Sequence, residues 1–285
     1  MDAKGVFIME ISIASYSFHR LLGKGQQDIF QYIQDCKTLG CTRLEPWNAH
    51  FTMIHERDNV IKTEAYSSEA SRLTEAEVEY LSLVKQAANQ VELPFGCIAV
   101  DGAYIYDDSE VQRNKNRAKA YRWLSIAEKL GAQYVRIDAG GRETWEGDVF
   151  PIIVEGYRDI IARARVLGIE VLVENHWGIS TEPENLIRLL EAVPDLGLLL
   201  DSFNWAYGKQ AQGWLQCAKY AKATHIKTFA FTESGEELTQ NIATFCKLLI
   251  ENGFKGCWGV ESVPIDGDEF TAARQTIALI KESVQ

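Results

Sequence analysis

Four polar residues in the second half of the chain stand at the ends of short apolar runs. Glu174 follows the run 171–173, Asp201 follows 198–200, Glu261 follows 258–260, and His225 opens a further run. If they converge, three carboxylates and one imidazole make a hard, mainly oxygen site that suits Mn²⁺ or Mg²⁺ and also accommodates Co²⁺ or Zn²⁺. Without a cation, three close carboxylates repel one another. We therefore predict that these four residues bind a divalent metal ion.

Each of these residues also has an ordinary structural explanation. Asp201 could cap the segment that follows it, and His225 taken alone could be a core histidine. The alternative interpretation is therefore a metal-free polar cluster of satisfied ion pairs. Four such residues at equivalent strand ends favour a metal site over a metal-free cluster.

The elements that must position these residues follow a repeating pattern. A short strand-like run is followed by a longer run of helical periodicity about eight times, which predicts βα units and a parallel sheet. The helical runs include residues 29–39, 118–130, 157–167 and 242–252. The predicted strands begin near residues 11–15, 42–46, 95–100, 134–139, 170–174, 197–201, 224–228 and 256–261.

A closed barrel suits this pattern better than an open doubly wound sheet. The runs 171–173 and 198–200 are apolar without alternation, as in strands covered on both sides, and no GxGxxG follows the first strand. We predict one (β/α)8 TIM barrel domain over residues 1–285, with a long loop at about 48–72 after the second strand. The predicted ligands then end or occupy strands five to eight, which are neighbours around the ring, at the end where barrels carry their active sites.

Further polar and aromatic residues are predicted to contact substrate. His176 lies two residues after Glu174, and Lys227 two after His225, so each shares its neighbour's direction on an extended strand. A loop hydrogen bond for His176 and a buried Lys–Glu pair for Lys227 are the alternatives. Arg136 and Glu45 are charges within apolar runs and are expected to face each other or the pocket, with pairing favoured over catalysis. The remaining candidates, for which loop packing is the alternative, are His19, Trp47 and His50.

Composition narrows the class of protein. The formal net charge of −11 disfavours nucleic acid and anionic membranes as partners. The six cysteines are scattered without a CxxC pair, as in reduced thiols of a cytosolic protein. No apolar run approaches the roughly 20 residues that span a bilayer. We therefore expect a cytoplasmic protein whose partner is a small molecule.

The segments around these residues resemble a known family. Residues 173–176 (VENH), 200–204 (LDSFN), 225–227 (HIK) and 259–261 (GVE) are similar to the sugar phosphate isomerase/epimerase family with the xylose isomerase-like TIM barrel. The resemblance extends to residues 13–18 and 135–140. It implies that Glu174, Asp201, His225 and Glu261 bind a divalent ion, often Mn²⁺, and that Glu174 and Glu261 are the catalytic acid/base pair acting through an enediolate.

The chain also departs from the best-known keto-sugar epimerases of this family. Those enzymes place a histidine and an arginine where this chain has Asn204 and Phe231. A metal-dependent sugar isomerase or epimerase is the leading prediction. The alternative is a 3-keto-glycoside lyase or C-glycoside deglycosidase, a type of protein that often has a small partner subunit. An abasic-site endonuclease and a non-catalytic sugar-binding barrel are further alternatives, and a homo-oligomer stays open.

Overall fold

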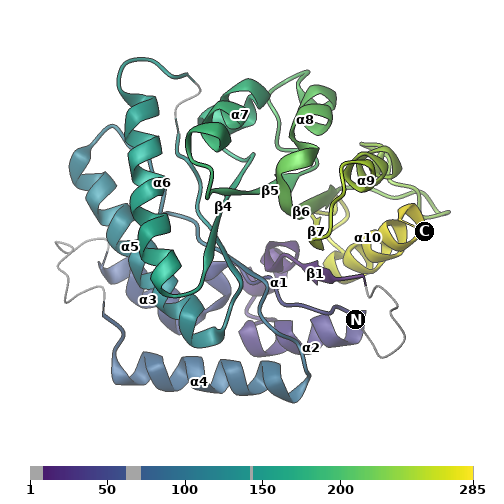
Figure 1. The fold of residues 1–285 in the computed structure, drawn as a ribbon. Coiled ribbons are helices and arrows are strands. Elements are labelled where there is room, and N and C mark those ends of the chain that lie inside the picture. The colour runs from purple at the N-terminus through teal and green to yellow at the C-terminus, as the bar shows by residue number, and fades with distance from the viewer. Residues whose placement is uncertain (1–8, 62–71, 142–143, 285) are drawn as a thin grey trace.

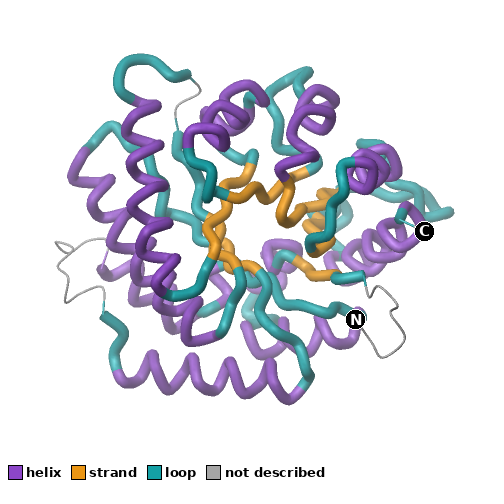
Figure 2. Tube along the Cα trace, viewed as in Figure 1, coloured by secondary structure: helices purple, strands orange, loops and turns teal. Residues whose placement is uncertain are grey.

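The computed structural model describes residues 9–61, 72–141 and 144–284. Seven parallel strands form one curled sheet in the order β1-β7-β6-β5-β4-β3-β2. The strands are β1 Ile11–Ile13, β2 Cys97–Ala99, β3 Tyr134–Arg136, β4 Glu170–Glu174, β5 Gly197–Asp201, β6 Ala221–Thr228 and β7 Cys257–Ser262. Figure 2 shows these strands around a common centre with the helices outside them, so the predicted TIM barrel is confirmed.

The helices cover the outside of the sheet (Figure 1). They are α1 His19–Gly23, α2 Ile29–Leu39, α3 Thr52–Ile61, α4 Glu75–Gln90, α5 Glu110–Leu130, α6 Val149–Val166, α7 Pro183–Ala192, α8 Gln210–Cys217, α9 Ile242–Glu251 and α10 Glu269–Ser283. The predicted helix at 29–39 matches α2, which Asp28 caps and which ends at Gly40 with φ 80°. Glycine adopts that left-handed conformation most easily because it has no Cβ.

The second predicted strand, near residues 42–46, is not a continuous strand. The segment instead lies between the two edge strands of the sheet. Isolated parallel bridges join it to both sides, between Ala14 and Glu45 and between Leu44 and Phe95. Pro46 and Pro94 lack the backbone N–H that a regular ladder needs at these positions. The segment nevertheless occupies the eighth position of the ring and holds Glu45 inside it.

Side chains alternate along the strands toward the ends that carry the predicted ligands. Leu172 and Leu199 form a small apolar layer inside the ring with Cys97 and Ala223, whereas Val171, Val173, Leu198 and Leu200 pack into the outer core under the helices. Because side chains two residues apart point the same way, the residue two places after each inner-layer residue also points inward. Two residues after Leu172, Leu199 and Ala223 come Glu174, Asp201 and His225, so these three side chains also point into the ring.

The long loop predicted at about 48–72 is partly helical. Asn48–His50 forms a short 3-10 helix and Thr52–Ile61 forms α3, while residues 62–71 lie outside the described part of the chain. Phe51 and Ile54 are fully buried, and Phe51 packs edge-on against Trp123 of α5. The mostly polar sequence concealed this helix because its inner face also buries Asp58, a charged residue.

A buried ion-pair network joins α3, α4 and α5. Arg122 donates from Nε to Asp58 at 2.9 Å and from its terminal nitrogens to Glu77, and its side chain is fully buried. Trp123 donates from Nε1 to the second oxygen of Asp58 at 2.7 Å. Glu77 also closes the capping box of α4 with Thr74. The position of α3 against the barrel therefore depends on charges that are buried.

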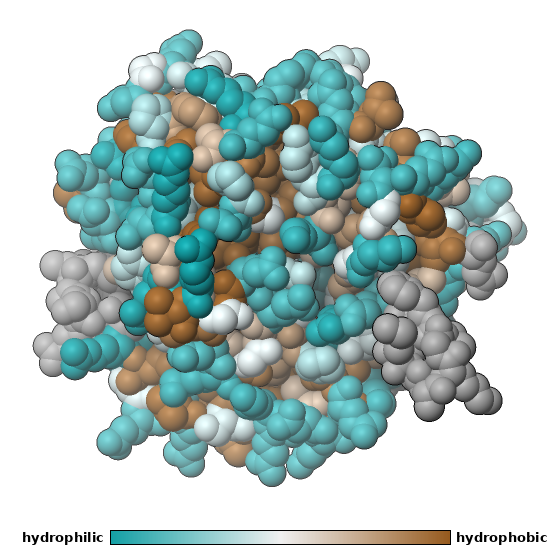
Figure 3. All heavy atoms as spheres, in the orientation of Figure 1, coloured by the Kyte–Doolittle hydropathy of each residue, from teal (hydrophilic) through white to brown (hydrophobic). Residues whose placement is uncertain are grey.

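The surface agrees with the acidic, polar composition. Figure 3 shows mainly hydrophilic side chains on the face drawn there, with hydrophobic ones scattered among them. Among the described residues, no helix combines the length and the apolar character that a membrane span requires.

Candidate metal centre

The structure brings the four predicted ligands together. Glu174 ends β4, Asp201 ends β5, His225 lies in β6 and Glu261 in β7, and all four are buried. Each offers one ligand atom, and these atoms all lie within 4.8 Å of one another. The alternation along neighbouring parallel strands produces this convergence, because equivalent strand ends meet at one edge of the ring.

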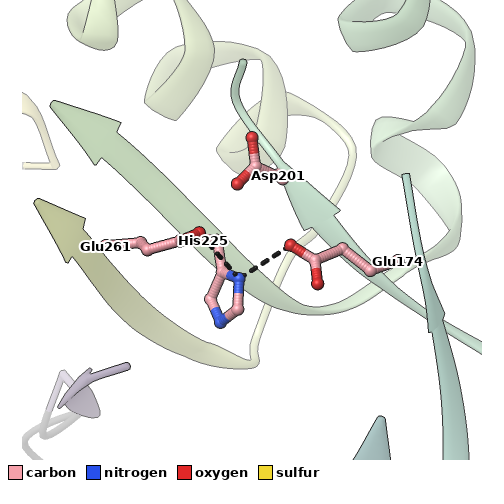
Figure 4. A group of neighbouring side chains, drawn as sticks. All are labelled: Glu174, Asp201, His225 and Glu261. Carbon is pink, nitrogen blue, oxygen red and sulfur yellow. Dashed lines mark hydrogen bonds and ion pairs between the residues drawn. The ribbon is translucent and has the colours of Figure 1, made fainter. Parts of the chain in front are cut away.

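His225 lies at the middle of the cluster. Its Nδ1 is 2.8 Å from Glu174 Oε1 and 3.2 Å from Glu261 Oε2. Figure 4 shows the two glutamates reaching His225 from opposite sides, with Asp201 above the ring. The nitrogen and the two carboxylates thus face one common point.

The residues present fit a divalent cation. Oδ2 of Asp201 and Oε2 of Glu261 are buried and accept no hydrogen bond, although Lys227 Nζ lies 3.4 and 3.3 Å from them. Five buried carboxylates line this region against two permanent cations, Arg136 and Lys227, and a buried excess of negative charge favours a bound cation. The carboxylates are those of Glu45, Asp138, Glu174, Asp201 and Glu261.

The pKa shifts express the same excess of negative charge. Burial, together with the neighbouring Glu261 and Glu174, raises the pKa of Asp201 to about 7 against the opposing charge of Lys227. Burial also acts on Glu174, but His225, Arg136 and His176 outweigh it and lower its pKa to about 2. One carboxylate is therefore held ionised while its neighbour is forced towards the neutral form, unless a cation joins them.

Lys227 enters the same site. Its ammonium donates to Asn204 Oδ1 at 2.9 Å and pairs with Asp201 and Glu261. Burial works against the charged form, but Asp201 and Glu261 raise the pKa of Lys227 above its usual value. Asn204, which stands where the best-known epimerases have a histidine, thus orients this lysine.

Of the two arrangements expected from the sequence, Arg136 does not face Glu45, and both residues instead face the cavity. The guanidinium of Arg136 contacts Asp101 at 2.9 Å, Asp138 at 2.8 Å and Glu174 at 3.1 Å. The carboxylate of Glu45 lies 3.1 Å from His225 Nε2, and both side chains line the cavity. The register between strands that are not neighbours decides such pairings, and no local pattern carries that register.

His176 is held by a carboxylate that the sequence reading overlooked. Its Nδ1 lies 3.1 Å from Oδ2 of the fully buried Asp138, and Glu174 and Asp138 raise the pKa of His176 against the effect of burial. Asp138, Glu174 and His176 form a second cluster of metal-binding atom types, but Arg136 already contacts both of its carboxylates. Asp138 lies two residues after Arg136 in the run 134–139, and this spacing could have indicated that the two side chains share a direction.

A cavity of about 260 Å³ lies above the cluster. Its wall includes the predicted ligands Glu174, His225 and Glu261. Three predicted substrate-contacting residues, Arg136, His176 and Lys227, lie beside them in the same wall. Aromatic side chains complete the wall. They are Tyr16, Trp47 and Trp177, and Asp101 Oδ2 accepts the indole N–H of Trp47 at 2.9 Å. The sequence reading included Trp47 but not Tyr16 or Trp177.

The structure places two predicted substrate contacts away from the cavity wall. His19 stacks on Tyr16, and its Nδ1 lies 3.2 Å from Glu269. His50 is fully buried, with Nδ1 2.9 Å from Ser15 Oγ and Nε2 3.1 Å from Gln27 Oε1. Because the amide oxygen of Gln27 only accepts, Nε2 carries the proton and Nδ1 accepts from Ser15. His50 therefore supports the Ser15 and Trp47 side of the cavity from behind.

Acidification should weaken the fold through His50. Burial lowers the pKa of His50 from 6.5 to about 4, so between these values the unfolded chain binds a proton that the folded chain does not. Stability from this residue is complete above pH 6.5 and is lost as the pH falls, by about 2 kcal/mol from pH 7 to pH 5. Urea unfolding of wild type and His50→Gln at pH 7, 6 and 5 measures it. Equal pH slopes in the two proteins would contradict this assignment.

The fold and the buried cluster of carboxylates and histidine together define a parallel barrel with a candidate metal site at the carboxyl ends of its strands. Residues 33–283 match the family model described as xylose isomerase-like TIM barrel. The chain belongs to this family, as the resemblance implied. A search of curated protein sequences gives no match.

Several solved structures share the fold. L-ribulose 3-epimerase superposes with a TM-score of 0.72 at 12% identity, over 97% of this chain and 95% of that one. The 3-keto-D-glucoside 4-epimerase of E. coli gives 0.71 at 14% identity, over 96% and 100%. A probable 3-DHS dehydratase of Bacillus anthracis gives 0.65 at 15% identity, over 96% and 99%. At these identities the likeness establishes the fold.

Proposed function

We propose that the chain is a divalent-metal-dependent sugar isomerase or epimerase that removes a proton next to a carbonyl. The observation that carries the proposal is the approach of Glu174 and Glu261 to His225 Nδ1 from opposite sides, at 2.8 and 3.2 Å. Two of the structures that share the fold are named as sugar epimerases, which supports this choice of substrate class.

The ligands of the ion would be Glu174, Asp201, His225 and Glu261. A divalent ion bound there would polarise a substrate carbonyl and so acidify the neighbouring C–H. One glutamate would accept that proton, and the other, after taking up a proton from solvent, would deliver it to the opposite face of the deprotonated carbon. Lys227, held by Asn204, can donate a hydrogen bond to a substrate oxygen in the same cavity. Trp47 and Tyr16 offer ring faces for the apolar side of a sugar.

The test is exchange of solvent deuterium. Protein loaded with Mn²⁺ is incubated in D₂O with a panel of ketoses and 3-keto-glycosides, and NMR follows both isomer formation and deuterium at the carbon next to the carbonyl. We expect a product labelled at that carbon with at least one sugar. Glu174→Gln or Glu261→Gln should slow the reaction by about 10²- to 10⁴-fold, the usual contribution of a positioned acid or base.

Glu170→Gln is the matched control, because Glu170 is exposed at the opposite end of the same strand, β4. It should leave the rate unchanged. Mn²⁺-loaded protein that exchanges no deuterium into any sugar of the panel would count against the proposal.

A second candidate reaction is elimination, as in a 3-keto-glycoside lyase. Lys227 and His176 both line the cavity beside the two glutamates, so the site holds nitrogen acids that could protonate a departing oxygen. A dehydratase is also among the structures that share the fold. In the same experiment, release of an aglycone or of water without an isomeric ketose would favour elimination over isomerisation.

A further inference from the structure

Both ring nitrogens of His225 face carboxylates. Nδ1 faces Glu174 and Glu261, and Nε2 lies 3.1 Å from Oε1 of Glu45, a residue on the irregular segment between β1 and β2. We propose that Glu45 is a positioning residue, which accepts the Nε2–H of His225 and thereby fixes Nδ1 as the nitrogen that binds the metal. This inference rests on the metal site of the proposed function.

The carboxylate of Glu45 is itself fixed in place. Ser12 Oγ donates to Glu45 Oε2 at 2.5 Å, which leaves Oε1 for His225. The backbone N–H of Glu45 donates to the hydroxyl of Tyr32 at 2.7 Å, and its carbonyl accepts from Ser15 at 2.9 Å. Glu45 is 3% exposed. The backbone bonds fix the residue and the bond from Ser12 fixes its carboxylate, so Oε1 is held facing the imidazole.

Gly259 has no side chain, and this leaves the space in which Glu45 contacts His225. A Cβ at Gly259 would lie 2.8 Å from Glu45 Oε2, 2.2 Å from the Thr224 carbonyl oxygen and 3.4 Å from the His225 ring. A larger residue at this position would push the carboxylate or the strand aside. The close approach explains why the inner face of β7 carries a glycine two residues before Glu261.

A carboxylate on the far nitrogen has a defined chemical effect on a metal-binding histidine. It holds one tautomer, fixes the plane of the ring, and makes the ligating nitrogen more basic. Losing such a partner typically weakens metal binding by about 10- to 100-fold. The competing interpretation is that Glu45 only supplies negative charge near a histidine, and this predicts a different response to an uncharged acceptor.

The experiment measures Mn²⁺ affinity by isothermal titration calorimetry without any sugar, on wild type, Glu45→Ala, Glu45→Gln and Glu10→Gln. Glu45→Ala should bind about 10- to 100-fold more weakly. Glu45→Gln keeps an oxygen acceptor for Nε2–H and can turn its amide to Ser12, so its affinity should stay within about threefold of wild type. Glu10→Gln is the matched control and should bind like wild type, because the partly exposed carboxylate of Glu10 pairs with Arg43 and not with His225.

A second readout follows the ring itself. In ¹⁵N-histidine NMR of Zn²⁺-loaded protein, the His225 ring should keep its Nε2–H in wild type and Glu45→Gln and lose that single tautomer in Glu45→Ala. If Glu45→Ala fails to fold, Ser12→Ala takes its place, and it should weaken Mn²⁺ binding at least threefold because the carboxylate is freed to turn.

The outcomes separate this inference from the proposed function. Equal affinity of Glu45→Ala and wild type overturns it, and so does Glu45→Gln binding as weakly as Glu45→Ala, because charge alone would then explain the loss. In both cases the metal site of the proposed function survives. A wild type that takes up no divalent ion overturns both.

Discussion

Replacing Glu174 with Gln and Asp201 with Asn in one protein is expected to abolish metal binding, with a loss of Mn²⁺ affinity of at least about a thousandfold, or roughly 4 kcal/mol. The two carboxylates come from adjacent strands and face the same point as His225 Nδ1. Hard divalent ions depend on charged oxygen ligands. The double variant replaces two of the three carboxylates of the site with neutral amides. Elemental analysis of protein purified without chelator or affinity metal measures the bound ion, and calorimetry measures affinity.

Misfolding would also lose metal, so the fold of the double variant needs its own measurement. The metal-free variant should unfold at or near the temperature of the metal-free wild type, because the substitutions remove charge repulsion among buried carboxylates. Excess Mn²⁺ should raise the unfolding temperature of wild type only, since an ion that binds the folded state alone stabilises it.

A matched control changes the same two residue types at the other end of the barrel. Glu170 and Asp195 are both exposed, near the starts of β4 and β5, and Glu170→Gln with Asp195→Asn should leave metal content unchanged. If wild type is empty and cannot be loaded with Mn²⁺, Mg²⁺, Co²⁺ or Zn²⁺, the four residues form a polar cluster neutralised by Lys227 and Arg136.

The barrel and the four converging residues were predictable from the sequence, because both depend on short-range periodicity. An apolar run that ends in a carboxylate shows where a strand stops, and neighbouring parallel strands stop at one edge. The step of two residues along β4, from Leu172 to Glu174, is the clearest case. The same periodicity correctly predicted that the side chains of Lys227 and His225 point the same way, because both line the cavity.

The partners of the buried charges were not predictable in the same way. Glu45 and Arg136 both lie within apolar runs, which indicated that each needed a partner but not which one. Glu45 reaches His225 across the ring, 180 positions away in sequence, and Arg136 reaches Asp101 in a loop. Such contacts depend on strand order and on loops, whereas the sequence pattern reports only the local direction of a side chain.

Helix α3 was missed for a related reason. Its buried face combines Ile54 with Asp58, and a charged residue on that face breaks the apolar periodicity on which helix prediction depends. The charge is tolerated because Arg122 comes from α5, 64 positions away in sequence. The helix is therefore hard to recognise from its own sequence, because the partner of its buried charge comes from a distant part of the chain.

The same ion pair leads to the second large expected effect, in which Arg122→Met lowers the free energy of unfolding by about 3–5 kcal/mol. Methionine fills similar space but leaves Asp58 and Glu77 as buried carboxylates without the guanidinium that contacts both. Removing one partner of a buried pair costs more than the pair itself contributes, because the remaining charge stays desolvated. Urea unfolding at pH 7 measures the change.

Arg158→Met is the control, because Arg158 is an exposed arginine of α6 whose ion pair with Glu155 is also exposed, and such pairs contribute at most about 0.5–1 kcal/mol. Acidification provides a second check on the cause. Burial acts to raise the pKa of Glu77, but its bonds to Arg122 outweigh burial and hold that pKa below its usual value in wild type. Arg122→Met removes this effect, so Glu77 takes up a proton at higher pH in the variant and the stability difference should narrow as the pH falls from 7 to 4.5. A loss below 1 kcal/mol, or a difference that stays constant with pH, would mean that α3 is held by Phe51 and Ile54 rather than by the buried charges.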